Sequence, residues 1–84
     1  MNYRILAKPR AQKALDDLSL PEQERVSAAI DDLAENPRPA GCRKMKSENA
    51  WRIRVGRYRV IYEVDDPSQV VVLLHVGHRK DVYR

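Results

Sequence analysis

The chain has 84 residues, 43% of them hydrophobic, which suits one globular domain spanning residues 1–84 and is too short for a second core. No apolar run is long enough to span a membrane, and the first ten residues lack the apolar core of a signal peptide, so we expect a cytoplasmic protein. The single cysteine, Cys42, cannot form an internal disulfide, and the sequence has no histidine–cysteine cluster that would indicate a metal site. The net charge of +4 favours an anionic partner.

The first half of the chain predicts a strand followed by a helical hairpin. YRILA, residues 3–7, is a short apolar strand candidate, and Pro9 suits the first turn of a helix because proline there loses no needed N–H group. Apolar residues then recur at spacings of three and four, which gives this helix one apolar face: Ala11, Ala14, Leu15 and Leu18. SLPE, residues 19–22, is a capping-box pattern that begins a second helix, and Pro37 ends it.

The second half predicts a basic loop and three strands. Residues 37–49 contain two prolines and a glycine among basic side chains, which is typical of a loop. The strands that follow are residues 51–55, 58–64 and 69–76. Gly56 leads the two-residue connection between the first two strands, as in a type II′ turn. The order β-α-α-β-β-β predicts an α+β fold, in which a helical hairpin covers one face of a small, mostly antiparallel, four-stranded sheet.

Charge is divided along the chain. Residues 16–35 carry seven acidic side chains and one basic one, whereas residues 38–59 carry eight basic side chains and one acidic one. We interpret the acidic segment as a solvent-exposed helical surface and the basic segment as a landing surface for a polyanion.

Four arginines crowd into the hairpin WRIRVGRYRVIYEV, residues 51–64. The two-residue turn pairs Arg54 with Arg59 and places Arg52 on the same face of the sheet, although like charges directly opposite each other are destabilising. The apolar side chains of the hairpin project from the other face, under the helices: Trp51, Ile53, Val55, Val60, Tyr62 and Val64. Because an arginine fork binds phosphate bidentately, we interpret the arginine face as a phosphate clamp. The alternative is a charged face neutralised by acids, in which Glu63 is more readily a counter-ion than a base.

Two motifs carry a resemblance to a known family. After the helical hairpin, WRIRVGRYRVIYEV and VGHRKDVYR (residues 76–84) resemble the RelE branch of the RelE/ParE toxins of bacterial type II toxin–antitoxin systems. The resemblance implies a ribosome-dependent endoribonuclease that cleaves mRNA in the ribosomal A site without a metal or cofactor. The ribose 2′-OH attacks the adjacent phosphate, which gives a 2′,3′-cyclic phosphate and a free 5′-OH. It also implies a cognate RelB-like antitoxin, with which the toxin forms a complex that binds operator DNA.

The resemblance also implies which residues are catalytic. Arg52 and Arg54 match the paired basic residues of the first hairpin strand, and Arg59 matches the arginine of the next strand. In this reading Arg54 and Arg59 hold the scissile phosphate. Arg79 lies near the leaving 5′-oxygen, and Tyr83 stacks on or orients the target nucleotide, or helps to activate the 2′-OH.

The family's best-known members carry lysines on the first hairpin strand, where this chain has two arginines. Arginine does not give up its proton in proteins, so the proton acceptor must lie elsewhere. His78 is the candidate base or acid, because an imidazole titrates near neutral pH. His75 lies within an apolar strand, which favours a hydrogen-bonded core or supporting role. The remaining basic side chains are expected to bind RNA or the ribosome: Arg43, Lys44, Lys46, Arg57 and Lys80.

Two other functions remain open at this point. A ParE-type toxin shares the fold and poisons DNA gyrase, but that branch generally lacks the combination of basic residues and terminal tyrosine found here. A non-catalytic nucleic-acid-binding module is the second alternative, and it would bind RNA without cleaving it.

Overall fold

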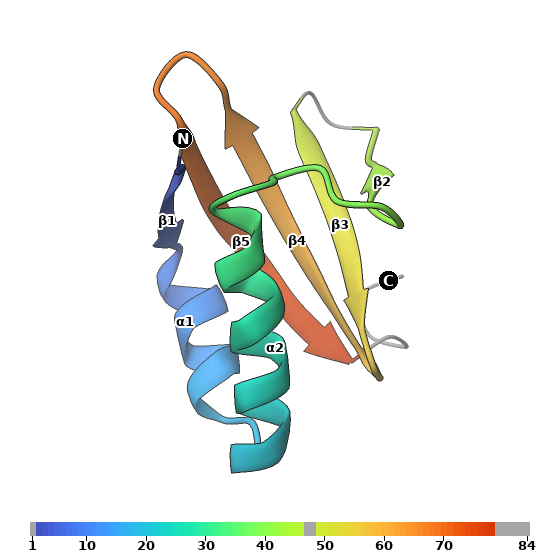
Figure 1. Ribbon diagram of the computed structural model, residues 1–84. Helices are drawn as coiled ribbons and strands as arrows, with labels where there is room; N and C mark the ends of the chain where they lie inside the picture. The colour runs from blue at the N-terminus through green and yellow to red at the C-terminus, as the bar shows by residue number, and fades with distance from the viewer. Residues whose placement is uncertain (1, 47–48, 79–84) are drawn as a thin grey trace.

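The computed structural model describes residues 2–46 and 49–78, and within them two helices cover one face of a five-stranded sheet (Figure 1). In chain order the elements are β1 (Arg4–Ala7), α1 (Pro9–Asp16), α2 (Leu20–Leu33), β2 (Arg43–Lys44), β3 (Ala50–Val55), β4 (Tyr58–Asp65) and β5 (Val70–His78). The strand order is β1-β5-β4-β3-β2, with β1 parallel to β5 and every other pair antiparallel. The predicted α+β architecture is therefore confirmed, with the helices on a single face.

The predicted number of strands is wrong by one. Residues 37–49 were expected to form a loop throughout, but Arg43 and Lys44 pair with Arg52 and Trp51 and add β2 to the edge of the sheet. A strand of two residues is too short to show a period-two pattern, and here it follows a segment rich in proline and glycine. At the other end of the chain, β5 continues two residues beyond its predicted end, through Gly77 and His78.

Both helices begin where their local sequence predicts. Pro9 is the first residue of α1, and Ser19 is the extended residue that precedes α2. The capping box is wrong in one respect, because the Ser19 hydroxyl bonds to the Glu22 carboxylate (Oγ–Oε1 3.0 Å) and makes no hydrogen bond to the helix backbone. Glu22 still places a negative charge in the first turn of α2, where the helix dipole favours it.

The core lies between the helices and the covered face of the sheet. Its buried members come from α1, α2 and strands β3 to β5: Ala11, Leu15, Val26, Ile30, Leu33, Ile53, Val55, Val60, Tyr62, Val64, Val71, Leu73 and Val76. The hairpin residues in this group are those predicted to face the helices, while Trp51 is only partly buried and packs against the group. None of the helices among the described residues is long and apolar enough to cross a membrane.

The β3–β4 hairpin has the predicted register. Arg54 is directly opposite Arg59, and Arg52 is opposite Ile61. Of the two turn residues Gly56 alone has a positive φ, at +58°, as a type II′ turn requires of its leading residue. The sheet face opposite to the helices, which we call the open face, therefore carries the arginines.

The β4–β5 pair contains an irregularity that the strand pattern of the sequence did not predict. Ile61 pairs with His75 but Tyr62 pairs with Leu73, so Leu74 is an extra residue on β5 and forms a β-bulge. The bulge changes which side chains of β5 face each way. Val71, Leu73 and Val76 are buried on the helix side, whereas the residues between them are only partly buried.

Candidate functional site

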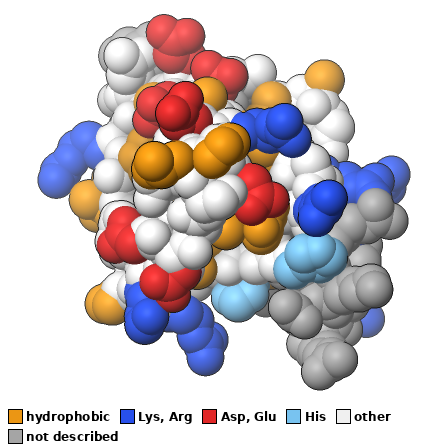
Figure 2. Space-filling view, turned by 90° about the horizontal axis from the view of Figure 1, so that it is seen from below, with side chains coloured by type: hydrophobic (Ala, Val, Ile, Leu, Met, Phe, Trp, Pro, Cys, Tyr) orange, Lys and Arg blue, Asp and Glu red, His pale blue; other side chains and the backbone are white. Residues whose placement is uncertain are grey.

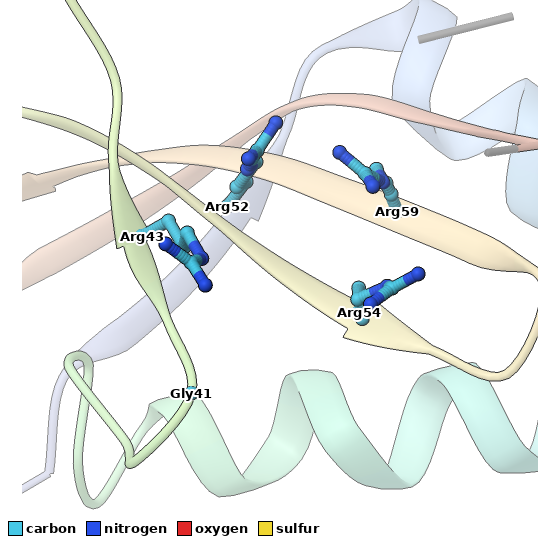
Figure 3. A pocket seen from close by; sticks show the side chains of 5 residues that line it. All are labelled: Gly41, Arg43, Arg52, Arg54 and Arg59. Atoms are coloured by element: carbon cyan, nitrogen blue, oxygen red, sulfur yellow. The ribbon is translucent and has the colours of Figure 1, made fainter. Parts of the chain in front are cut away.

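The open face carries a pocket of about 150 Å³ lined by four arginines and one glycine (Figure 3). We call it the arginine pocket, and its residues are Gly41, Arg43, Arg52, Arg54 and Arg59. The volume is roughly ten times the ~10–15 Å³ that one water molecule needs. The pocket therefore has room for a tetrahedral anion such as a phosphate group.

Strand pairing explains why these arginines meet. Arg43 of β2 is opposite Arg52 of β3, and Arg54 of β3 is opposite Arg59 of β4. Residues that are directly paired share a face of the sheet, so three neighbouring strands direct arginine side chains toward the same region (Figure 3). Gly41, at φ +92°, allows the chain to turn just before β2 and so brings Arg43 to the rim.

The arginines differ in their exposure to solvent. Arg59 is only 4% exposed, although a charged side chain is rarely buried, whereas Arg54 and Arg43 are exposed. A bound anion would thus meet one guanidinium at the base of the pocket and others around it. Electrostatic attraction is stronger at a partly desolvated charge than at a fully hydrated one. The buried position of Arg59 makes it the centre of the candidate site.

A polar network holds the segment that leads into β2. The Arg38 guanidinium donates two hydrogen bonds to the Asp66 carboxylate (Nη2–Oδ2 2.8 Å and Nη1–Oδ1 3.2 Å), and the Tyr3 hydroxyl donates a third (2.6 Å). The hydrogen bond from Arg38, followed by that from Tyr3, lowers the pKa of the Asp66 carboxyl. The buried Tyr62 hydroxyl donates to the Pro37 carbonyl oxygen at 2.7 Å. These contacts fix the loop from two sides and thereby position β2 beside the pocket.

The aromatic ring of Trp51 lies next to two cations. The Arg38 guanidinium is 5.2 Å from the centre of the ring and the Lys44 ammonium is 5.7 Å from it. Lys44 follows Arg43 on β2 and so projects toward the helix side of the sheet, away from the arginine pocket. Lys46 and Arg57, two other residues predicted to bind RNA, are exposed and do not line the pocket. The structure thus separates Arg43 from the other described residues that are predicted to bind RNA, which are Lys44, Lys46 and Arg57.

His78, the predicted base or acid, lies away from the arginine pocket. It is opposite Tyr58, and the two rings meet edge to face with their centres 5.8 Å apart. Tyr58 belongs to the helix side, where its hydroxyl donates to the Glu22 carboxylate at 3.1 Å. Burial, followed by this hydrogen bond, raises the pKa of the Tyr58 hydroxyl. The other three predictions in the closing segment, Arg79, Lys80 and Tyr83, lie outside the described residues.

The expected counter-ion does not pair with the arginines. Glu63 is exposed on the open face opposite Ala50, and within residues 2–46 and 49–78 the ion pairs are Lys13–Asp17 and Arg38–Asp66. Among the same residues no three histidine, cysteine or acidic side chains lie close enough together to bind a metal ion. The chemistry that the described side chains offer at this site is the binding of an anion.

Sequence reasoning missed the position of His75. The bulge at Leu74 places His75 opposite Ile61, and therefore on the open face with the arginines. His75 is partly buried there, and not part of the core as the apolar strand suggested. The doublet Leu73-Leu74 was the available signal, because two large apolar residues in succession interrupt the alternation of a strand.

Comparison with known proteins gives consistent matches over most of the chain. Residues 5–83 match the family described as the ParE toxin of type II toxin–antitoxin systems, parDE. The toxin RelG of Mycobacterium tuberculosis is 39% identical over 61 residues, which cover 70% of this chain and 69% of RelG.

Solved structures of RelE toxins are also similar to this chain. The archaeal RelE–RelB complex from Pyrococcus horikoshii contains a chain with a TM-score of 0.84 and 29% identity, covering 94% of this chain and 97% of that one. The isolated E. coli RelE toxin has a TM-score of 0.82 and 26% identity, covering 96% of this chain and 90% of that one.

Proposed function

This chain belongs to the ParE toxin family of type II toxin–antitoxin systems, and we propose that it is a RelE-like toxin that cleaves mRNA on the ribosome. The observation that carries the proposal is the arginine pocket, where four guanidinium groups from three strands surround a space suited to one phosphate. The reaction is attack of a ribose 2′-OH on the adjacent phosphate, which needs no metal ion. It takes place in the cytoplasm, where ribosomes and mRNA are found.

The arginines supply charge stabilisation at the scissile phosphate. As the 2′-oxygen attacks, negative charge accumulates on the non-bridging oxygens, and fixed cations at those positions lower the barrier. Arg59, buried at the base of the pocket, and Arg54, directly opposite it, are the groups to which we assign this role. Arg52 and Arg43, which are paired across β3 and β2, line the rest of the arginine pocket. Removing one such donor typically costs about 10²- to 10³-fold in rate.

The remaining predicted residues act around this centre. We assign Arg79 to the leaving 5′-oxygen and Tyr83 to the target nucleotide, on the strength of the resemblance between VGHRKDVYR and the RelE motif. Lys44, Lys46, Arg57 and Lys80 would contact RNA phosphates, which position the substrate without reading its sequence. Binding through such contacts weakens steeply as the salt concentration rises.

A partner is part of the proposal. The Pyrococcus horikoshii relative was solved as a RelE–RelB complex, and we propose that a RelB-like antitoxin neutralises this chain in the same way. An acidic antitoxin segment would offset the exposed arginines of the open face. The resulting complex is also expected to bind operator DNA.

The test is primer extension on an mRNA incubated with ribosomes, in the presence and absence of the purified toxin. We expect new 5′ ends within codons when the wild-type protein is present, and none with Arg59→Ala or Arg79→Ala. Arg4→Ala is the matched control, because Arg4 is an exposed strand arginine opposite Val70 at the other end of the open face. Cleavage that survives both active-site substitutions contradicts the site, and no cleavage by the wild-type protein contradicts the function.

One observation favours a second candidate function. The family that matches residues 5–83 is described by its ParE members, and a ParE-type toxin poisons DNA gyrase. A supercoiling assay with purified gyrase separates the two functions. Inhibition of supercoiling together with intact mRNA supports the ParE-type function, and the opposite pattern supports the RelE-like one.

A further inference from the structure

The proposed reaction needs a proton acceptor for the 2′-OH, and none of the described residues that line the arginine pocket provides one. Its lining side chains are four guanidinium groups, which keep their protons in proteins. His78 faces Tyr58 on the helix side of the sheet. A group on the open face that can take up a proton near neutral pH therefore has to be found among the neighbours of the pocket.

The bulge in β5 places such a group beside the pocket. His75 is opposite Ile61, and Gly77 is opposite Arg59, so both residues of β5 share the open face with the arginines. Arg59 and His75 are diagonal neighbours across this strand pair, and such neighbours have their side chains about 7–8 Å apart. Without the extra residue Leu74, the strand would present His75 to the helices instead.

Gly77, two residues after His75 on β5, lies directly opposite Arg59. Because glycine has no side chain, His75 is the side chain of β5 next to Arg59 on the open face among the described residues. His75 is partly buried, which limits its orientations, and it is not enclosed in the core. Both histidine side chains reach the surface at the end of the molecule where the connection between the helices faces the viewer (Figure 2).

The charges that face His75 come from several elements. β4 contributes Arg59 and Glu63, β3 contributes Arg52 and Arg54, and β2 contributes Arg43. Next to β5 on its other side, Lys8 directly follows β1, and its backbone N–H donates to the Leu73 carbonyl oxygen at 2.9 Å. Helix α1 packs on the opposite face of β5. Cations thus outnumber the single carboxylate, and this balance stabilises negative charge that develops on the 2′-oxygen.

We propose that His75 is the proton acceptor for the ribose 2′-OH in the RNA cleavage proposed above, an inference that rests on that function. An imidazole nitrogen takes the proton of the 2′-OH, and the 2′-oxygen forms a bond to the phosphorus held by Arg54 and Arg59. The bond from phosphorus to the 5′-oxygen breaks, and its electron pair leaves with that oxygen, which takes a proton from water. Histidine fits this role because its ordinary titration lies between pH 5 and 8.

The test is the pH dependence of single-turnover mRNA cleavage on ribosomes, measured between pH 5 and 8.5 for wild type, His75→Gln and His78→Gln. The wild-type rate should rise with pH, and His75→Gln should lower the rate at pH 7.5 by about 10²- to 10⁴-fold and remove that rise. Thermal unfolding of His75→Gln, and its binding to ribosomes, should stay close to wild type. The smaller variant His75→Ala should regain part of its rate when free imidazole is added, which a merely structural role does not explain.

The outcomes separate this inference from the function on which it rests. A His75→Gln variant that keeps both its rate and the rise with pH overturns the assignment of His75 while the RNA cleavage stands. The assignment of His75 is also overturned if His78→Gln is the only variant in which the cleavage rate no longer rises with pH. If the wild-type protein cleaves no mRNA at any pH, the proposed function fails and the role of His75 fails with it.

Discussion

Substitution of Arg54 by threonine should stabilise the protein and inactivate it at the same time. Arg54 is exposed and directly opposite Arg59, so the folded state holds two like charges at a paired position of the sheet. Cross-strand pairs of this kind are worth about 0.2–1 kcal/mol, and removing the repulsion should raise the free energy of unfolding by that amount. For a chain of this size 1 kcal/mol corresponds to about 4–8 °C, so the thermal midpoint should rise by roughly 1–8 °C.

The matched control is Arg4→Thr. Arg4 is also an exposed strand arginine on the open face, but it stands opposite Val70 and has no like charge across from it. Threonine raises strand propensity in both variants, so the difference between their thermal midpoints isolates the repulsion. That difference should shrink in 1 M salt, where the screening length falls to about 3 Å.

The same variants test function. Arg54→Thr should lower the rate of mRNA cleavage by about 10²- to 10³-fold, whereas Arg4→Thr should leave it close to wild type. The reasoning is refuted if Arg54→Thr is less stable than wild type. The reasoning is also refuted if the thermal midpoint of Arg54→Thr rises only as much as that of Arg4→Thr and the rise does not change with salt. The paired arginines would then not repel each other.

Three further substitutions test the parts of the fold that hold the site. Tyr62→Phe leaves the Pro37 carbonyl oxygen without its buried donor and should cost about 1–3 kcal/mol in urea denaturation; an unchanged midpoint would contradict this. Gly56→Ala should cost about 1–2 kcal/mol, because alanine is strained at φ +58°, and calorimetry would reveal it. Asp66→Asn breaks the ion pair with Arg38 and should lower the thermal midpoint at pH 7. Because the folded pKa of Asp66 is lowered, its contribution is complete above the unfolded value of 3.8 and is lost as the pH falls further, so wild type and variant should converge in acid.

The hairpin and the helices were predictable because short-range rules determine them. A two-residue turn led by Gly56 leaves one register for the strands it joins, and that register places Arg54 opposite Arg59. Pro9 marks a helix start through a backbone property that holds in any fold, and Ser19 is the extended residue before α2 although its hydroxyl does not bond to the helix backbone. Predictions of this kind need no knowledge of distant contacts.

The features that were missed depend on pairing between segments far apart in the chain. Arg43 joins the pocket only because β2 pairs with the edge of β3. A strand of two residues is too short to show a pattern that predicts it. The face of His75 depends on a bulge opposite β4, and the same pairing places His78 against Tyr58. A period-two reading assigns faces only within an uninterrupted strand, so one extra residue reverses the assignment beyond it.

The parallel pairing of β1 with β5 has a consequence for the newly made chain. Arg4 cannot meet its partner Val70 until the chain between them has been synthesised, which takes roughly 3–13 s at cellular rates. During that interval the helices can form, but the apolar residues that later pack on β5 have no sheet to cover. Arg59, the arginine of β4, likewise emerges before β5, the strand that flanks it. The sheet that carries the arginine pocket is therefore complete only when its last described strand is added, seconds after β1 has been synthesised.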